Sequence, residues 1–155
     1  MLKIKRTDAS DPDFKELVVS LDQDLKVRDG EDYSFYAQYN KLDTIKNTVV
    51  AYLDDVAVGC GAVKMHESGV GEVKRMFVRP GYRGQGIAGK ILTELESWAT
   101  ELQFSKLILE TGMAQPEAIA LYTKSGYIRM PNYGQYENVE NSVCMQKQLS
   151  VPEAP

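Results

Sequence analysis

The sequence predicts a mixed α/β (α+β) fold, with helices packed on a mostly antiparallel sheet of about seven strands. Short apolar segments typical of strands recur along the chain, and turn residues separate some of them as in hairpins. Longer segments carry apolar residues at helical spacing. With 155 residues, 43% of them hydrophobic, we expect one domain at residues 1–150 and a tail at 151–155.

The first part of the chain predicts a strand and two helices. Leu2–Thr7 alternates apolar and basic residues, as in a half-exposed strand. Asp11 suits a helix cap and Pro12 the first helical position, and we expect this helix to end near Gly30. A shorter helix is expected at Glu31–Asn40, followed by a polar connection.

Three antiparallel strands should follow in a meander, because two turn signals interrupt an apolar stretch. One turn is Asp54-Asp55 and the other is Glu67-Ser68-Gly69. The expected strands are Thr48–Leu53, Val56–Met65 and Val70–Val78.

The second half predicts two helices and three strands. Gly86–Leu102 places apolar residues on one helical face, and Pro116–Lys124 is a helix that Gly126 would end. The polar, tyrosine-rich segment Pro131–Asn141 is expected to be a loop. The expected strands are Lys106–Glu110, Tyr127–Met130 and Val143–Leu149.

Composition narrows the classes of function. A net charge of −4 disfavours a nucleic-acid-binding protein, and no apolar run is long enough to span a membrane. The first residues lack the apolar core of a signal peptide, so we expect a cytoplasmic protein. The single histidine, His66, and the dispersed Cys60 and Cys144 supply no ligand set for a metal, so no metal is expected. We expect His66 at a strand end facing water and both cysteines as buried thiols.

Glycines 84, 86 and 89 form a cluster between an expected strand and an expected helix. Glycine lets the backbone approach a phosphate closely, and a helix N-terminus favours an anion. Arg83 and Lys90 flank the cluster and add positive charge. The sequence therefore predicts a site for a phosphorylated cofactor.

A dinucleotide site is one interpretation, since the glycines read G-x-G-x-x-G and Glu110 lies about 20 residues beyond them. Three features argue against it. Residues 79–83 intervene between the strand and the first glycine, the strand EVKRMFV is too charged to be covered on both faces, and the preceding strands form a meander.

The segment Arg83-Gly84-Gln85-Gly86-Ile87-Ala88, together with AIALYTKSGY at 118–127, resembles the two sequence motifs of the GNAT superfamily of acyl-CoA-dependent N-acetyltransferases. The resemblance extends in element order from near residue 1 to about 149. It implies the GNAT fold, a mixed sheet with a splayed central parallel pair flanked by four helices. It also implies acetyl transfer from acetyl-CoA to a primary amine.

The same resemblance implies a donor site. Backbone groups of Met76, Phe77 and Val78 should pair with the pantetheine arm, and the N–H of Met76 should polarise the thioester carbonyl. Gln115 stands where the family often carries Asn. The cofactor-binding residues expected from the motifs are Met76, Phe77, Val78, Arg83, Gly84, Gln85, Gly86, Ile87, Ala88, Gly89, Lys90, Gln115 and Tyr122.

Two residues are candidates for catalysis. Tyr122 stands where the family places a general acid for the leaving thiolate, unless it is only packed on its helix. Glu72 is the leading base, and strict alternation would place it on one face with Lys74 and Met76. Alternatively, Glu72 is only a solvent-exposed carboxylate on its strand, and Glu110 or a water relay removes the proton from the amine.

The acceptor site should come from the aromatic segments 26–40 and 131–138. Its candidate residues are Arg28, Glu31, Tyr33, Tyr36, Tyr133 and Tyr136. A small amine or amino-acid-like acceptor fits a closed pocket, whereas a protein lysine or N-terminus would need an open groove. We expect direct transfer, because both cysteines appear mid-strand and away from the motifs.

Two further possibilities stay open at the level of sequence. One is a non-catalytic acyl-CoA-binding sensor on the same fold. The other is a homodimer, formed by pairing at a sheet edge through Val143–Leu149.

Overall fold

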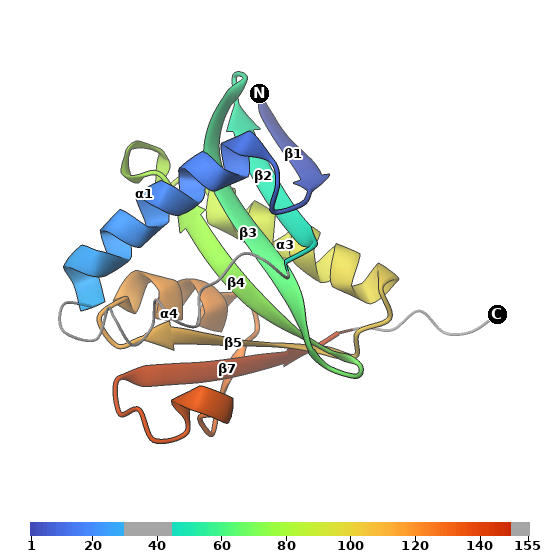
Figure 1. Ribbon diagram of the computed structural model, residues 1–155, viewed down its shortest axis with the longest axis vertical. Coiled ribbons are helices and arrows are strands. Elements are labelled where there is room, and N and C mark those ends of the chain that lie inside the picture. Colours follow the sequence, from blue (N-terminus) through green and yellow to red (C-terminus); the bar gives the residue numbers. More distant parts are fainter. Residues whose placement is uncertain (30–44, 150–155) are drawn as a thin grey trace.

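The computed structural model describes the backbone of residues 1–29 and 45–149, with the side chains of residues 1–26 and 45–149 (Figure 1). Within this part of the chain a seven-stranded mixed sheet has the order β1-β2-β3-β4-β5-β7-β6, which confirms the predicted fold class. The strands are β1 (Leu2–Thr7), β2 (Asn47–Leu53), β3 (Val56–Glu67), β4 (Val70–Val78), β5 (Lys106–Gly112), β6 (Ile128–Met130) and β7 (Ser142–Gln148).

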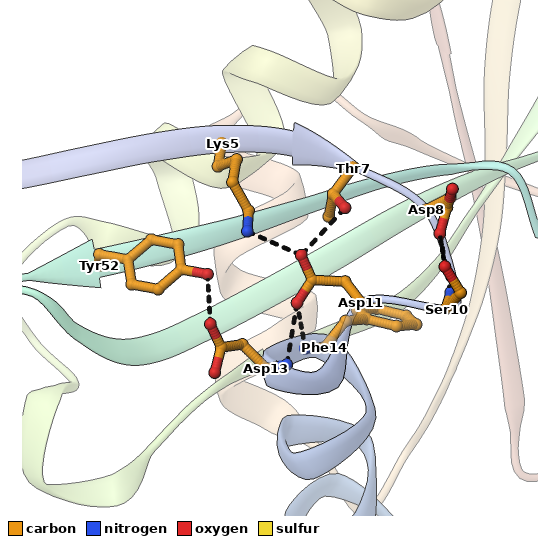
Figure 2. Close-up of polar contacts among 8 residues, drawn as sticks. All are labelled: Lys5, Thr7, Asp8, Ser10, Asp11, Asp13, Phe14 and Tyr52. Atoms are coloured by element: carbon orange, nitrogen blue, oxygen red, sulfur yellow. Dashed lines mark hydrogen bonds and ion pairs between the residues drawn. The ribbon is translucent and has the colours of Figure 1, made fainter.

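Helix α1 (Pro12–Asp29) begins where the sequence predicts, because Asp11 caps it (Figure 2). The Asp11 carboxylate accepts hydrogen bonds from the backbone N–H groups of Asp13, at 2.8 Å, and Phe14, at 3.4 Å. Its other oxygen accepts a bond from the Thr7 hydroxyl at 3.0 Å and lies 2.7 Å from Lys5 Nζ. This cap therefore joins the end of β1 to the start of α1.

The helices lie on both faces of the sheet. Figure 1 shows α1 crossing in front of the strands while α3 (Ile87–Glu101) runs behind them. The α1 face is closed by a buried cluster that includes Phe14, Leu17 and Ala62. On the opposite face, α3 and α4 (Pro116–Lys124) pack on a larger buried cluster.

Strand β4 contains a β-bulge that the sequence pattern did not reveal. Arg75 adopts a left-handed φ of +61°, and the pairing of β3 with β4 shifts between Cys60 and Ala62. Alternation restarts after the bulge, so Phe77 packs on the α1 face. Met76 packs with the cluster of the α3 face. The expectation that Met76 shares a face with Glu72 is therefore wrong.

The β4–β5 pair is the parallel pair at the centre of the sheet. Its register runs from Val70 opposite Lys106 to Val73 opposite Leu109. Beyond these residues the two strands continue, β4 to Val78 and β5 to Gly112, without pairing with each other. The strands thus splay toward their carboxyl ends, as expected.

Two further expectations meet different outcomes. The helix expected at Glu31–Asn40 lies outside the described residues. The proposed dimer edge at Val143–Leu149 is wrong for β7, because β7 is paired on one side with β5 and on the other with β6. Of the helices that the structure describes, none is long and apolar enough to cross a membrane.

Candidate active site

A cleft of about 390 Å³ opens where β4 and β5 diverge. Its walls come from the end of β4, the glycine loop and start of α3, the end of β5, and helices α1 and α4. Its volume is that of a site for a small molecule or cofactor arm. Most of the residues singled out in the sequence line it, namely Glu72, Met76, Phe77, Val78, Arg83, Gly84, Gly86, Ile87, Ala88, Gly89, Gln115, Tyr122 and Tyr136.

The glycine loop forms one end of this cleft. It follows a short 3-10 turn at Pro80–Tyr82, and Gly84 and Gly86 have φ values of +80° and +79°, which favour glycine. Gly86 is the N-cap of α3, so the first N–H groups of that helix point out of its end. Cβ atoms placed at Gly84, Gly86 or Gly89 would meet no atom within 4 Å. The loop therefore leaves open space in front of a helix N-terminus, as anion binding requires.

Arg83 lines the cleft and is held in place by three contacts. Its Nε donates to the carbonyl of Val78 at 2.8 Å, its Nη2 lies 3.7 Å from Asp24 Oδ2 of α1, and its guanidinium lies over the ring of Phe77. The guanidinium of Arg83, predicted to bind a phosphate, is thus paired with Asp24 of α1 and hydrogen-bonded to the end of β4.

Tyr122 of α4 is buried within the cleft wall, with 6% of its surface exposed. Its ring packs edge-on against Tyr127, with centroids 5.7 Å apart. Burial, and then the negative charge of Glu110, raises the pKa of Tyr122 well above its ordinary value. At neutral pH this hydroxyl keeps its proton, so its chemistry is that of a donor.

Glu72 lies on the other face of the sheet, the one that α1 covers. Lys74 pairs with Ala62, a member of the cluster under α1, and Glu72 is two residues away on the same strand. Glu72 is 7% exposed, and its Oε2 accepts a hydrogen bond of 2.5 Å from the hydroxyl of Tyr133. Lys74 Nζ lies 3.6 Å from the other oxygen, Oε1.

Glu110, the alternative base, lies on β5 beside the same cleft. The Ser142 hydroxyl donates to its Oε2 at 2.7 Å. Tyr136 lines the cleft together with both carboxylates. Burial raises the pKa of Tyr136, and the negative charges of Glu110 and Glu72 raise it further. Two carboxylates, those of Glu72 and Glu110, therefore line the cleft.

Cys144 lies within strand β7, as expected, and beside residues that line the cleft. It pairs with Glu110 across β5 and β7 and packs against Tyr136. Burial raises the pKa of its thiol. It is fully buried and protonated at neutral pH, so it remains a poor nucleophile. Cys60 is also fully buried, and burial raises the pKa of its thiol to about 12.

The remaining predicted residues fall into three groups. Tyr133 reaches the site through Glu72, whereas Gln85 and Lys90 are not among the residues that line the cleft. Glu31, Tyr33 and Tyr36, and the side chain of Arg28, lie outside the described part of the chain. His66 is exposed at the end of β3, as expected, with its ring 5.2 Å from that of Tyr133.

The structure also adds lining residues that sequence reasoning did not assign to the site. They include Leu21, Asp24 and Leu25 of α1 and Lys74 of β4. Strand alternation could have assigned Lys74 to the site, because it lies two residues after Glu72 on the same strand. No local feature of the sequence, in contrast, predicts that α1 lies over the cleft. Among residues 1–29 and 45–149, no group of three His, Cys, Asp or Glu side chains is placed to hold a metal ion.

Comparison with known proteins gives a consistent picture. A model of the acetyltransferase (GNAT) family matches residues 14–127. An IAA acetyltransferase of Azospirillum brasilense is 42% identical over 102 residues, which are 65% of this chain and 67% of that protein.

Solved structures with the same fold cover nearly the whole chain. An acyl-CoA N-acyltransferase from Klebsiella pneumoniae subsp. pneumoniae MGH 78578 has a TM-score of 0.81 at 33% identity, covering 97% of this chain and 99% of that one. The PaiA N-acetyltransferase of Thermoplasma acidophilum, solved in complex with coenzyme A, has a TM-score of 0.71 at 17% identity, covering 96% and 99%. This second likeness concerns the fold alone.

Proposed function

This chain belongs to the acetyltransferase (GNAT) family and is an acyl-CoA-dependent acyltransferase, and we propose that it moves the acetyl group of acetyl-CoA to the primary amine of a small molecule. The observation that carries the proposal is the single cleft that joins the glycine loop, the buried phenol of Tyr122 and the buried carboxylate of Glu72. These three groups come from separate elements, and direct acyl transfer needs each of them.

The donor would enter from the glycine loop. The first N–H groups of α3 and the backbone of Gly84 to Gly89 would hold its pyrophosphate. Its pantetheine arm would lie in the splay and pair with the end of β4, where Met76, Phe77 and Val78 line the cleft. The N–H of Met76 remains our candidate for polarising the thioester carbonyl.

The acceptor would approach from the α1 face. Glu72 would take a proton from the ammonium, and the neutral nitrogen would attack the thioester carbon. A C–N bond forms, the tetrahedral intermediate collapses and the C–S bond breaks. The departing sulfur takes a proton from the Tyr122 hydroxyl, which its raised pKa keeps protonated. The second proton of the attacking nitrogen then passes to the Tyr122 phenolate, which leaves the neutral amide, the free thiol and one proton on Glu72 to be released to solvent. Glu110 is the second candidate for the base, because it lines the same cleft.

Two features support a small acceptor over a protein segment. Glu72 and Tyr136 are 7% and 3% exposed, so an amine must enter the interior to reach them. The two carboxylates Glu72 and Glu110 also favour a cationic substrate. A protein lysine or N-terminus would need an open groove leading to this face.

Calorimetric titration with acetyl-CoA, followed by thiol release with a panel of amines, tests the proposal. We expect micromolar donor binding and turnover that falls at least a hundredfold in Glu72→Gln with donor affinity unchanged. Full turnover in Glu72→Gln together with loss in Glu110→Gln would transfer the base role to Glu110. Donor binding without turnover on any amine would favour the acyl-CoA sensor.

A further inference from the structure

Tyr133 contacts the candidate base from outside the cleft. Its hydroxyl donates to Glu72 Oε2 at 2.5 Å, a distance typical of a charge-assisted O–H···O⁻ bond. Glu72 lines the cleft, whereas Tyr133 is not among the residues that line it. Burial, and then the negative charge of Glu72, raises the pKa of Tyr133 well above its ordinary value. The phenol therefore stays protonated at neutral pH and serves Glu72 as a donor.

The ring of Tyr133 is held between aromatic neighbours. The ring of His66 on β3 packs edge-on against it, with centroids 5.2 Å apart. The ring of Tyr136 packs in the same manner at 5.8 Å. Tyr133 also packs against the buried cluster that Tyr136 forms with Cys144 of β7. Edge-to-face contacts of this kind favour one orientation of a ring, so they fix where the hydroxyl of Tyr133 lies.

The loop that carries Tyr133 is closed by its own hydrogen bonds. The side-chain amide of Asn132 donates to the carbonyl of Val139 at 3.0 Å, and the N–H of Tyr136 donates to the carbonyl of Tyr133 at 2.9 Å. This loop joins β6 to β7, and both strands lie on the far side of β5 from β4. The loop therefore reaches across β5 and presents a phenol in a fixed position to a carboxylate on β4.

A glutamate that acts as a base needs such support. Its side chain has several rotatable bonds, and ordering them costs conformational entropy. A general base must lie within hydrogen-bond reach of the proton that it removes. Because both oxygens of Glu72 belong to one planar carboxylate, holding Oε2 also restricts where Oε1 lies.

We propose that Tyr133 is a positioning residue for the reaction, which holds Glu72 by Oε2 so that its carboxylate meets the amine of the acceptor. The inference rests on the proposed function, in which Glu72 is the base. Tyr133 would act only through Glu72, whereas Tyr122 would act on the leaving sulfur.

A double-mutant cycle tests this role. The full-length protein, Tyr133→Phe, Glu72→Gln and the double variant are assayed by thiol release from acetyl-CoA, with phenethylamine, L-lysine and L-methionine as amine probes. We expect Tyr133→Phe to lower kcat about tenfold and to leave the KM of acetyl-CoA within about twofold. In the Glu72→Gln background the same change should alter kcat by less than about twofold, because no base remains to be positioned. A merely structural role would lower kcat equally in both backgrounds.

Tyr52→Phe is the matched control, because Tyr52 also donates to a carboxylate, Asp13 Oδ2 at 2.6 Å, and does not line the cleft. It should leave kcat unchanged. Asn132→Ala is a second test variant, which removes the bond to Val139 without altering Tyr133 itself. It should lower kcat in the unaltered protein and not in the Glu72→Gln background. A thermal melt of each variant checks that it is folded.

The outcomes separate this inference from the proposed function. Unchanged turnover in Tyr133→Phe, or an equal loss in the Glu72→Gln background, overturns the inference and leaves the transferase proposal standing. Full turnover in Glu72→Gln also overturns it, since Glu72 is then not the base. Donor binding without transfer to any amine overturns both proposals.

Discussion

The cap of helix α1 allows a stability prediction worked from individual contacts. The Asp11 side chain is 7% exposed and connects β1 to α1 through four partners, shown in Figure 2. Replacing Asp11 with alanine removes the acceptor for two helix N–H groups and for the Thr7 hydroxyl. Asp11→Ala should therefore destabilise the fold without touching the cleft.

The expected magnitude follows from those contacts. Loss of the cap costs about 1 kcal/mol. Loss of the hydrogen bond from Thr7 costs about 1 kcal/mol more. The ion pair with Lys5 adds little, since the Lys5 side chain is 48% exposed. The sum of about 2 kcal/mol corresponds to a fall in Tm of roughly 4–8 °C for a chain of this length.

The isosteric change Asp11→Asn distinguishes the contribution of helix capping to stability from the contribution of the negative charge. Asparagine caps helices about as well as aspartate, so Asp11→Asn should cost about half as much as Asp11→Ala. Burial by itself would raise the pKa of Asp11, but the bonds from Lys5, Thr7 and the two backbone N–H groups outweigh it and lower the pKa. A lowered pKa stabilises the fold above the ordinary pKa of an aspartate, near pH 4, and this contribution is lost as the pH falls further.

Urea denaturation at pH 7, and again between pH 5 and 3, measures these differences. The stability difference between the unaltered protein and Asp11→Asn should be full at pH 7 and shrink below about pH 4. Asp8→Ala, in the same turn but exposed, is the control and should cost much less. The reasoning is refuted if Asp11→Ala costs under 0.5 kcal/mol, a quarter of the sum expected from its cap and its Thr7 bond.

Three further predictions concern the cleft. Tyr122→Phe should lower kcat about a hundredfold and leave the KM of acetyl-CoA within about twofold, because the role proposed for the hydroxyl is to protonate the leaving thiolate and not to bind the donor. Gly86→Ala should weaken acetyl-CoA binding at least tenfold by calorimetry, since a Cβ would occupy the space in front of α3. Asp24→Asn should tighten acetyl-CoA binding by about two- to fivefold, because it frees Arg83 for the donor phosphates.

Each of these has a matched control. Tyr127→Phe removes a neighbouring hydroxyl that donates to Glu96, and it should leave kcat unchanged. If Tyr127→Phe lowered kcat as much as Tyr122→Phe, the effect of Tyr122→Phe would be explained by altered packing and not by a lost proton donor. Gly134→Ala imposes similar strain at a φ of +53° but should not change donor affinity. Asp22→Asn breaks the ion pair with Arg75 and should leave acetyl-CoA affinity unchanged. If it raised the affinity as much as Asp24→Asn, release of Arg83 from Asp24 would not be the cause.

Local signals in the sequence accounted for most elements. Asp11 and Pro12 marked the start of α1, and Asp54-Asp55, with φ values of +49° and +68°, formed the expected hairpin turn. The glycine spacing predicted the open loop before α3, because the positive φ values of Gly84 and Gly86 constrain residue type locally.

Features that depend on long-range packing were not predictable in this way. The bulge at Arg75 arises from pairing with β3 and from the Asp22 contact on α1, neither of which leaves a local pattern. The same holds for Tyr133, whose bond to Glu72 joins residues 61 positions apart. The position of Cys144 opposite Glu110 was not predictable either, because the register of β7 against β5 cannot be read from either strand alone.

The short parallel register between β4 and β5 has a consequence for the lifetime of the protein. Four residue pairs join β4 to β5 there. A pantetheine arm lying between the diverging strand ends would form backbone hydrogen bonds that the two strands do not make with each other. A ligand that binds only the native state stabilises it, by about 2.7 kcal/mol at a hundred times its Kd. Unfolding and proteolysis should therefore slow as acetyl-CoA rises, which thermal shift against donor concentration measures. The abundance of the protein would then follow the supply of its own donor.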